Sequence, residues 1–486
     1  MSGTGRLTSS LNPRTRRIVY GETDIAGLVR ELDETTTVDL AHVVMLVRQG
    51  LLPPEGGSAL LRYIVRLREQ RYAPLHALPA PRGVYLMYET HLIDVLGAEL
   101  GGKLHTGRSR NDLKATATAM RLRETALELG SQLLRLQAVL LSRARAAADE
   151  AMPVYTHFQA AMPVTYGHYL LGVASALDRD IAAFRHATGA LRRCPLGAVA
   201  VAGTDLPIDT SLTAGLLGFD TPVAHALDAV ASRDGALRVT AAAAGAAVTL
   251  SRLATDLQLW STAEFGMIRF ADRLVGGSSA MPQKRNAFLL EHIRAKAGTV
   301  VGAWTGGMGM AKSTPFTNSI EVGTEAMGAV WPGLRAALDS VLLSQAVVSG
   351  ARLERERSAQ RAEEGFVTAT ALANRLVRAG VPFRTAHHLV GDAVRRAVAR
   401  GDTELTGLDL PDGIDAPGPD ELRVPAVVSD HRSGGGPGAF DETFGLIRRE
   451  LREHGAWLRD WNDQLDAACR SLAIATDKVI TYGGDR

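Results

Sequence analysis

The sequence predicts an all-α protein whose centre is a bundle of unusually long helices. Ala, Leu and Arg are abundant, β-branched residues rarely cluster, and long segments contain no proline. Helices of such length exceed the usual three or four turns of a globular protein. They favour a bundle that is shared between subunits.

Four long helices are expected in the middle third of the chain. The first spans Asn111 to Glu150, carries an apolar leucine stripe at helical spacing and ends before Pro153. The second spans Tyr166 to Leu191. The third, Ala231 to Phe265, is apolar over most of its surface, which places it inside the bundle or at a subunit interface. The fourth, Glu291 to Met310, contains glycines that allow close helix packing.

The distribution of helices and loops divides the chain into three parts. They are an N-terminal helical domain (1–102), a central helix-bundle domain (103–350) and a C-terminal helical domain (351–486). Within the first part, residues 1–17 are rich in Ser, Thr and Arg and are expected to be a disordered tail, with a targeting segment as the alternative. Within the last part, Leu405 to Gly438 is rich in Pro and Gly and is expected to be loop.

Composition excludes several classes of function. A formal net charge of +2 gives no reason to expect nucleic acid or membrane partners. The apolar run from Val239 to Leu250 is too short to span a bilayer. The two cysteines, Cys194 and Cys469, form neither a disulfide framework nor a metal cluster, and they fit a reducing, cytoplasmic compartment. No phosphate loop or nucleophile elbow is present, and no cofactor or metal is implied.

The most distinctive stretch runs from Gly276 to Asn286 and reads GGSSAMPQKRN. A helix is expected to start directly after it, and a donor-rich loop at a helix N-terminus is a ready anion site. Such a loop can also activate a serine hydroxyl. Taken alone, Ser278 and Ser279 favour a capping or turn pair. The ordered series of Ser, Ser, Met, Pro, Lys and Asn is much more specific.

Two further motifs narrow the interpretation. Residues His105–Asp112 read HTGRSRND, and residues Tyr155–Gln159 read YTHFQ. Together with the serine loop, these motifs resemble the argininosuccinate lyase family of the fumarase/aspartase superfamily, over roughly residues 85 to 395. The resemblance implies a three-domain, all-α homotetramer with a shared central bundle. It also implies a cofactor-free carbon–nitrogen lyase that eliminates fumarate from an N-substituted aspartate, such as argininosuccinate in arginine biosynthesis.

The resemblance assigns the catalytic roles. Such an elimination needs a base for the Cβ proton, donors for the dianionic aci-carboxylate, and an acid for the leaving nitrogen. Ser279 is the expected base, and Lys284 and Asn286 are expected to hold the carboxylate whose charge grows. His157, paired with Glu291, is expected to handle the proton at the nitrogen.

The remaining candidates bind the substrate. By resemblance, Arg110 and its neighbours contact the succinyl half, since Arg suits bidentate carboxylate binding. The full set of predicted binding residues is Ser109, Arg110, Asn111, Thr156, Gln159, Ser278 and Asn286. Five histidines are interpreted as structural: His42, His105, His168, His387 and His388.

Several positions depart from the family pattern. Leu113 stands where Gln is usual, and Ala287-Phe288 stands where Pro-Asp is usual. The stretch Phe316–Glu325 lacks the Tyr, Gln and Lys that contact substrate in the family. The catalytic half is thus intact, while the half that recognises the amine is altered. Three interpretations stay open: an argininosuccinate lyase, a lyase or synthase for another N-succinyl amine such as an aminocarboxylic acid, and a non-catalytic structural relative.

Overall fold

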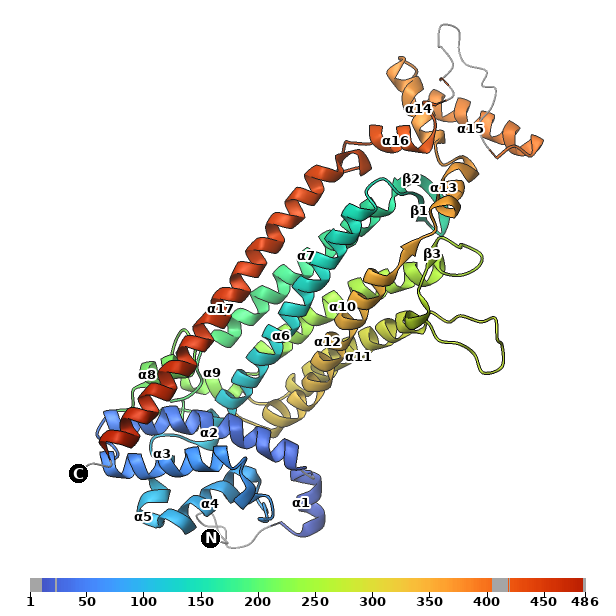
Figure 1. Ribbon diagram of the computed structural model, residues 1–486. Coiled ribbons are helices and arrows are strands. Elements are labelled where there is room, and N and C mark those ends of the chain that lie inside the picture. The colour runs from blue at the N-terminus through green and yellow to red at the C-terminus, as the bar shows by residue number, and fades with distance from the viewer. Residues whose placement is uncertain (1–10, 22–23, 404–417, 419, 484–486) are drawn as a thin grey trace.

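The computed structural model describes residues 11–21, 24–403, 418 and 420–483, and it confirms a mostly helical fold (Figure 1). Five long helices form the central bundle and alternate in direction along it. They are α6 (Arg110–Ala146), α7 (Tyr166–Thr188), α10 (Asp234–Trp260), α11 (Phe288–Ala311) and α12 (Ala326–Gly350). Their inward faces bury Leu, Ala and Val side chains in one continuous core. The four predicted helices are confirmed, with ends that differ by a few residues.

The all-α prediction is wrong in one respect that matters for the site, because two small antiparallel sheets are present. Their strands are β1 (Ala151–Thr156) and β2 (Gln159–Thr165), and β3 (Ile268–Arg269) and β4 (Arg352–Leu353). The first pair is a hairpin between α6 and α7, in which Pro153 lies opposite Pro163. Proline cannot donate a ladder hydrogen bond and is rare inside strands, so these residues concealed the hairpin in the sequence.

Further helices close the lower end of the bundle in Figure 1. They are α1 (Pro13–Tyr20), α2 (Ile25–Arg48), α3 (Pro54–Glu69), α4 (Val84–Leu96), α5 (Ala98–Gly101), α8 (Thr210–Leu216) and α9 (Ala226–Ala231). The predicted disordered tail is wrong for residues 13–17, which belong to α1. Asn12 caps this helix by accepting a hydrogen bond from Thr15 N. The prediction for residues 1–10 lies outside the described residues.

The C-terminal part extends beyond the upper end and then returns. Its helices are α13 (Arg355–Glu363), α14 (Ala369–Arg378), α15 (Phe383–Arg400), α16 (Val424–Asp430) and α17 (Phe440–Tyr482). Helix α17 has 43 residues and packs on α7, α6, α2 and α3 down the length of the molecule (Figure 1). The last helix of the predicted C-terminal domain therefore packs against helices of the other two predicted domains. The domain boundaries remain a prediction.

The predicted loop at 405–438 is helical over α16, so that prediction is wrong there. Residues 433–435 form a turn, as expected, and 405–417 and 419 lie outside the described residues. Within the part of the chain that the structure describes, no helix combines the length and apolar character needed to cross a bilayer.

Candidate active site

The start of α6 carries the first group of predicted residues. Ser109 is the N-cap: its Oγ accepts a hydrogen bond from Asn111 N at 3.3 Å, and its own N–H donates to Asp112 Oδ1 at 2.9 Å. This reciprocal capping box fixes where the helix begins. The side chain of Asn111 donates to Ala200 O at 3.2 Å, while Arg110 is exposed. The capping box thus holds Arg110 on the first turn of the helix, where its guanidinium is accessible.

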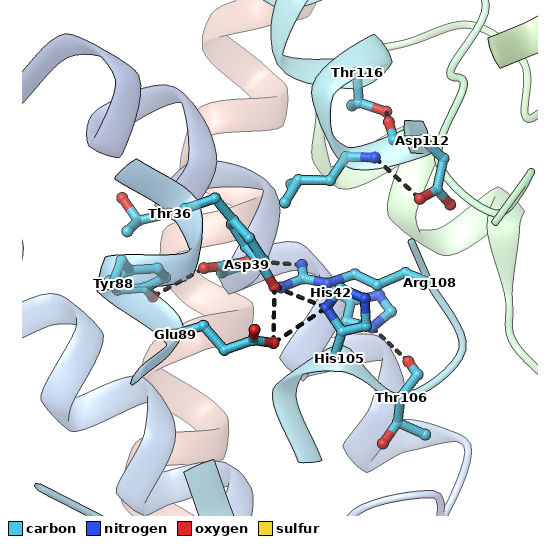
Figure 2. Close-up of polar contacts among 12 residues, drawn as sticks. Thr36, Asp39, His42, Tyr88, Glu89, His105, Thr106, Arg108, Asp112 and Thr116 are labelled. Carbon is cyan, nitrogen blue, oxygen red and sulfur yellow. Dashed lines mark hydrogen bonds and ion pairs between the residues drawn. The ribbon is translucent and has the colours of Figure 1, made fainter. Parts of the chain in front are cut away.

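A buried ion pair fixes the segment that precedes this cap (Figure 2). Arg108 Nη1 lies 2.6 Å from Asp39 Oδ1, and neither side chain is exposed. Tyr88 OH donates to the other carboxylate oxygen of Asp39 at 2.8 Å. His42 Nε2 contacts Thr106 O at 2.8 Å. Because a buried charge needs both a counter-charge and hydrogen bonds, this network holds residues 106–108 firmly against α2 and α4.

The two histidines of this network make contacts that agree with the structural role predicted for them. Burial, helped by the nearby Arg108 charge, lowers the pKa of His42 well below its usual range. His105 Nδ1 lies 2.8 Å from Tyr85 OH and 3.3 Å from Glu89 Oε1. Through these contacts both side chains help to position the motif.

Asp112 joins the start of α6 to a loop far along the chain. Its Oδ2 accepts hydrogen bonds from Gly197 N at 3.0 Å and Val199 N at 2.9 Å. Burial raises the pKa of Asp112, and the backbone amides that it accepts from oppose that rise. Val199 has a φ of 55°, a strained value for a β-branched residue. The carboxylate thus holds a strained loop beside the predicted substrate-binding residues.

A cavity of about 370 Å³ opens beside Arg110, between α2, α6 and the start of α12. Its charged lining residues are Arg30, Glu31, Glu34, Arg110, Lys114 and Arg121, and Leu113, Gly323 and Thr324 also line it. Burial raises the pKa of Glu34 to about 7, against the opposing effect of Arg121. Gly323 and Thr324 belong to a π-helical turn, Glu321–Glu325, a feature that recurs at functional sites. The segment that departs from the family pattern therefore borders the cavity that contains Arg110.

The tip of the β1–β2 hairpin carries the second group. His157 and Phe158 are the two central residues of the turn, and their φ angles are 52° and 60°. Two positive φ angles are typical of the type I′ turn, which normally uses Asn and Gly. Thr156, His157 and Gln159 are all exposed, and Phe158 is 77% exposed. The predicted turn between helices is thus a strained hairpin tip that presents these side chains outward, and strain of this kind gathers at functional sites.

The serine loop is the third group. Gly276 and Asn286 exchange two backbone hydrogen bonds of 2.8 Å, which close the loop at its base. Ser278 Oγ accepts from Met281 N at 3.1 Å, so this serine stabilises the turn. Ser279 and Lys284 are exposed. Ser278 Oγ therefore organises the turn, whereas Ser279 is accessible; the base role of Ser279 and the substrate-binding role of Ser278 stay predictions.

Two contacts fix the loop to the segment that precedes it, just after β3. Arg285 Nη1 lies 2.5 Å from Asp272 Oδ1, and its Nη2 donates to Phe270 O at 2.9 Å. Helix α11 starts at Phe288, two residues beyond Asn286, so the loop does precede a helix N-terminus. The positive end of that helix dipole therefore lies beside the loop.

Glu291 lies in the first turn of α11. Its Oε1 accepts a hydrogen bond from Gln258 Nε2 at 3.2 Å. The Oε1 atom of Gln258 in turn accepts a hydrogen bond from Arg294 Nη1 at 2.8 Å. The contacts among the described residues of one chain do not pair Glu291 with His157. That pairing stays a prediction.

The first group lies at one end of the bundle, and the second and third groups lie at the other end. The start of α6 lies at the lower end in Figure 1, whereas the hairpin and the loop before α11 lie at the upper end. Helix α6 has 37 residues, which at the usual helical rise separates its ends by about 55 Å. One chain therefore brings Ser109, Arg110 and Asn111 together, but it does not bring them to His157 or Ser279. Of the residues that depart from the family pattern, Leu113 lines the cavity beside Arg110, whereas Phe288 begins α11 next to the serine loop.

Sequence reasoning missed the residues that support the first group. Asp39 is 69 positions from Arg108, and no spacing rule joins them. A signal was nonetheless present, because Asp39 interrupts the apolar run from Val38 to Leu46. A carboxylate there requires a buried partner. The carboxylates Glu31 and Glu34 were missed because only the folded chain places them beside Arg110.

Comparisons with known proteins agree with these motifs. A family model described as lyase matches residues 77–302, and one described as argininosuccinate lyase C-terminal matches residues 366–413. The chain is 36% identical over 456 residues to an argininosuccinate lyase of Methanoculleus marisnigri, covering 90% of this chain and 91% of the relative. It is 34% identical over 460 residues to that of Methanothrix thermoacetophila, covering 91% and 93%.

Solved structures share the fold. A structure of an EDDS lyase variant with bound fumarate aligns with a TM-score of 0.86 at 28% identity, covering 100% of this chain and 99% of that chain. A class II fumarase from Schistosoma mansoni aligns with a TM-score of 0.66 at 17% identity, covering 77% and 85%. The second likeness supports the fold alone.

Proposed function

Because the chain belongs to the argininosuccinate lyase family of the fumarase/aspartase superfamily of lyases, we propose that it is a carbon–nitrogen lyase. In this proposal it eliminates fumarate from an N-substituted aspartate or runs the same reaction in reverse. The serine loop carries the proposal: it keeps the ordered Ser, Ser, Met, Pro, Lys and Asn, two backbone hydrogen bonds close its base, and Ser279 is accessible ahead of a helix N-terminus.

The proposed reaction proceeds through a dianion. Ser279 takes the Cβ proton, and the electron pair left on carbon delocalises into the adjacent carboxylate. Lys284 and Asn286 stabilise that growing charge, together with the amides of the loop. The electron pair then forms the double bond of fumarate as the C–N bond breaks, and His157 gives a proton to the leaving nitrogen. The Ser279 hydroxyl can act as a base only if it is ionised, and in this proposal the Lys284 cation and the dipole of α11 stabilise the resulting alkoxide.

We assign this site to several chains of a homotetramer. The separation of about 55 Å along α6 supports this assignment, because it places the start of α6 far from the hairpin tip and the serine loop of the same chain. Helix α11 also carries an exposed apolar stripe in the single chain. It consists of Val301, Trp304 and Met308, at helical spacing and 37%, 38% and 46% exposed. Stripes of this kind mark protein interfaces, and the stripe lies on the helix that directly follows the serine loop.

The amine half has two candidates. Argininosuccinate is supported by the named relatives. The cavity beside Arg110 favours the second candidate, an N-succinyl aminocarboxylic acid. Its lining combines Glu31 and Glu34, which suit an ammonium group, with Arg30 and Arg121, which suit a carboxylate. The family's Tyr, Gln and Lys at Phe316–Glu325 are absent, so a long guanidinium tail loses its usual partners.

The experiment that decides the function supplies purified enzyme with fumarate and a panel of amines, with adducts detected by mass. We expect an aminocarboxylic acid to react and arginine to react poorly, because each lost buried contact costs roughly 1–3 kcal/mol. Cleavage of argininosuccinate with a kcat/KM on the order of 10⁴ M⁻¹s⁻¹ or more would instead establish argininosuccinate as the substrate. Absence of any adduct, with argininosuccinate also stable, would leave a non-catalytic relative.

Lys284→Met is expected to lower kcat strongly. A fixed cation beside a developing dianion is stronger in the transition state than in the ground state, so its loss affects turnover more than substrate binding. Steady-state kinetics with the reacting amine measure the effect. Lys478→Met, at an exposed position on α17, is the matched control and should be nearly silent. Similar losses of kcat in both variants would show that Lys284 is an ordinary surface lysine with no role in catalysis.

A further inference from the structure

A cluster of metal-ligand side chains lies where α17 packs on α6 and α7. Asp178 on α7 and the pair Glu450 and His454 on α17 each offer a ligand atom, and these atoms all lie within 4.8 Å of one another. Glu450 and His454 are four residues apart and so face the same side of α17. The cluster is remote in sequence from the three groups of the active site, and no step of the proposed reaction uses it.

A second observation indicates that the cluster lacks a partner. The His454 side chain is 5% exposed, and neither ring nitrogen has a hydrogen-bond partner among the described residues. Its Nε2 lies 3.5 Å from Asp178 Oδ1, too far for a good hydrogen bond. Gln137 on α6 is fully buried and donates to the same oxygen at 2.9 Å. The amide oxygen of Gln137 is also without a partner.

From this arrangement we propose that Asp178, Glu450 and His454 form a divalent transition-metal site, with the Gln137 amide beside it as the source of a fourth ligand if it turns its oxygen toward the ion. A metal with bonds of about 2.0–2.2 Å holds neighbouring ligand atoms about 3–4 Å apart, so the cluster closes by a small inward movement. One imidazole with carboxylate and amide oxygens suits Zn²⁺ or Mn²⁺ better than Mg²⁺. Carboxylate and His ligands on facing helices are the usual pattern of metal sites inside bundles.

The site is structural in this proposal. Its ligands join α17 to the bundle, so a bound ion stabilises the folded chain by mass action. Ion binding should therefore raise the thermal unfolding midpoint. It should leave turnover unchanged, because none of the ligands belongs to the proposed catalytic machinery.

The test uses the untagged full-length protein, stripped with a chelator and titrated with Zn²⁺ alone. We expect one tightly bound ion per chain and a higher unfolding midpoint. Glu450→Gln should weaken binding by at least about tenfold. Glu453→Gln removes the same charge from an exposed position three residues along α17 and should bind like the wild type. Equal uptake by the two variants would overturn the proposal.

A second measurement does not depend on how the variants fold. Co²⁺ bound to the wild-type protein should give visible ligand-field absorption that Zn²⁺ displaces. A folded wild-type protein that takes up neither ion would show that the cluster is only a buried polar contact between helices, and the proposal would fail.

Discussion

Ser279→Ala is expected to reduce turnover at least about a hundredfold while the protein keeps its fold, because the group that removes the Cβ proton is lost. We expect the fold to be kept because Ser279 is exposed and its side chain fills no space in the core. Fumarate release or consumption measures the rate, and circular dichroism checks the fold.

Ser278→Ala is the matched control on the neighbouring residue. Ser278 accepts hydrogen bonds from Ala280 N and Met281 N, so its loss loosens the turn without removing a base. We expect a smaller loss of turnover than for Ser279→Ala. Near-normal turnover of the Ser279 variant would show that another residue is the base.

Asp39→Ala is expected to destabilise the protein by about 3–5 kcal/mol, because it leaves the fully buried Arg108 guanidinium without its counter-charge. Chemical denaturation measures this loss. Arg108 directly precedes Ser109, the N-cap of α6, so the substitution should also displace the predicted substrate-binding residues. A higher KM in the protein that remains folded would reveal that displacement.

An exposed ion pair gives the control for burial. Asp441 Oδ1 lies 2.6 Å from Arg145 Nη1, the same separation as in the buried pair, but both side chains are largely exposed. Asp441→Ala should therefore cost at most about 1 kcal/mol. Equal losses for Asp39→Ala and Asp441→Ala would contradict the structural role assigned to the buried pair.

The sequence predicted the long helices well because their apolar periodicity continues over many turns. The β1–β2 hairpin escaped prediction because Pro153 and Pro163 lie opposite each other within it, where proline normally argues against a strand. The first helix escaped because residues 13–17 lack acids and apolar runs. Its Asn12 cap and Pro13 at the first position are short-range signals that compositional reasoning passed over.

For the site, motifs identified individual residues but not their spatial relations. The serine loop, the hairpin tip and the start of α6 were each found because their chemistry is local in sequence. The Asp39–Arg108 pair and the Glu34 carboxylate in the cavity depend on contacts between distant segments, which no periodicity encodes. The separation along α6 likewise became evident only from the fold, and the proposal of a site that combines several chains rests on it.

The most direct test of this composite site mixes two inactive variants, Ser279→Ala and His157→Asn, under conditions that exchange subunits. If the two residues reach one site from different chains, about a quarter of the sites in random hybrids are intact, and activity should return. Mixing Ser279→Ala with Lys284→Met is the control and should stay inactive, because both residues belong to one loop of one chain. Hybrids that form but recover no activity in the first mixture would contradict the account.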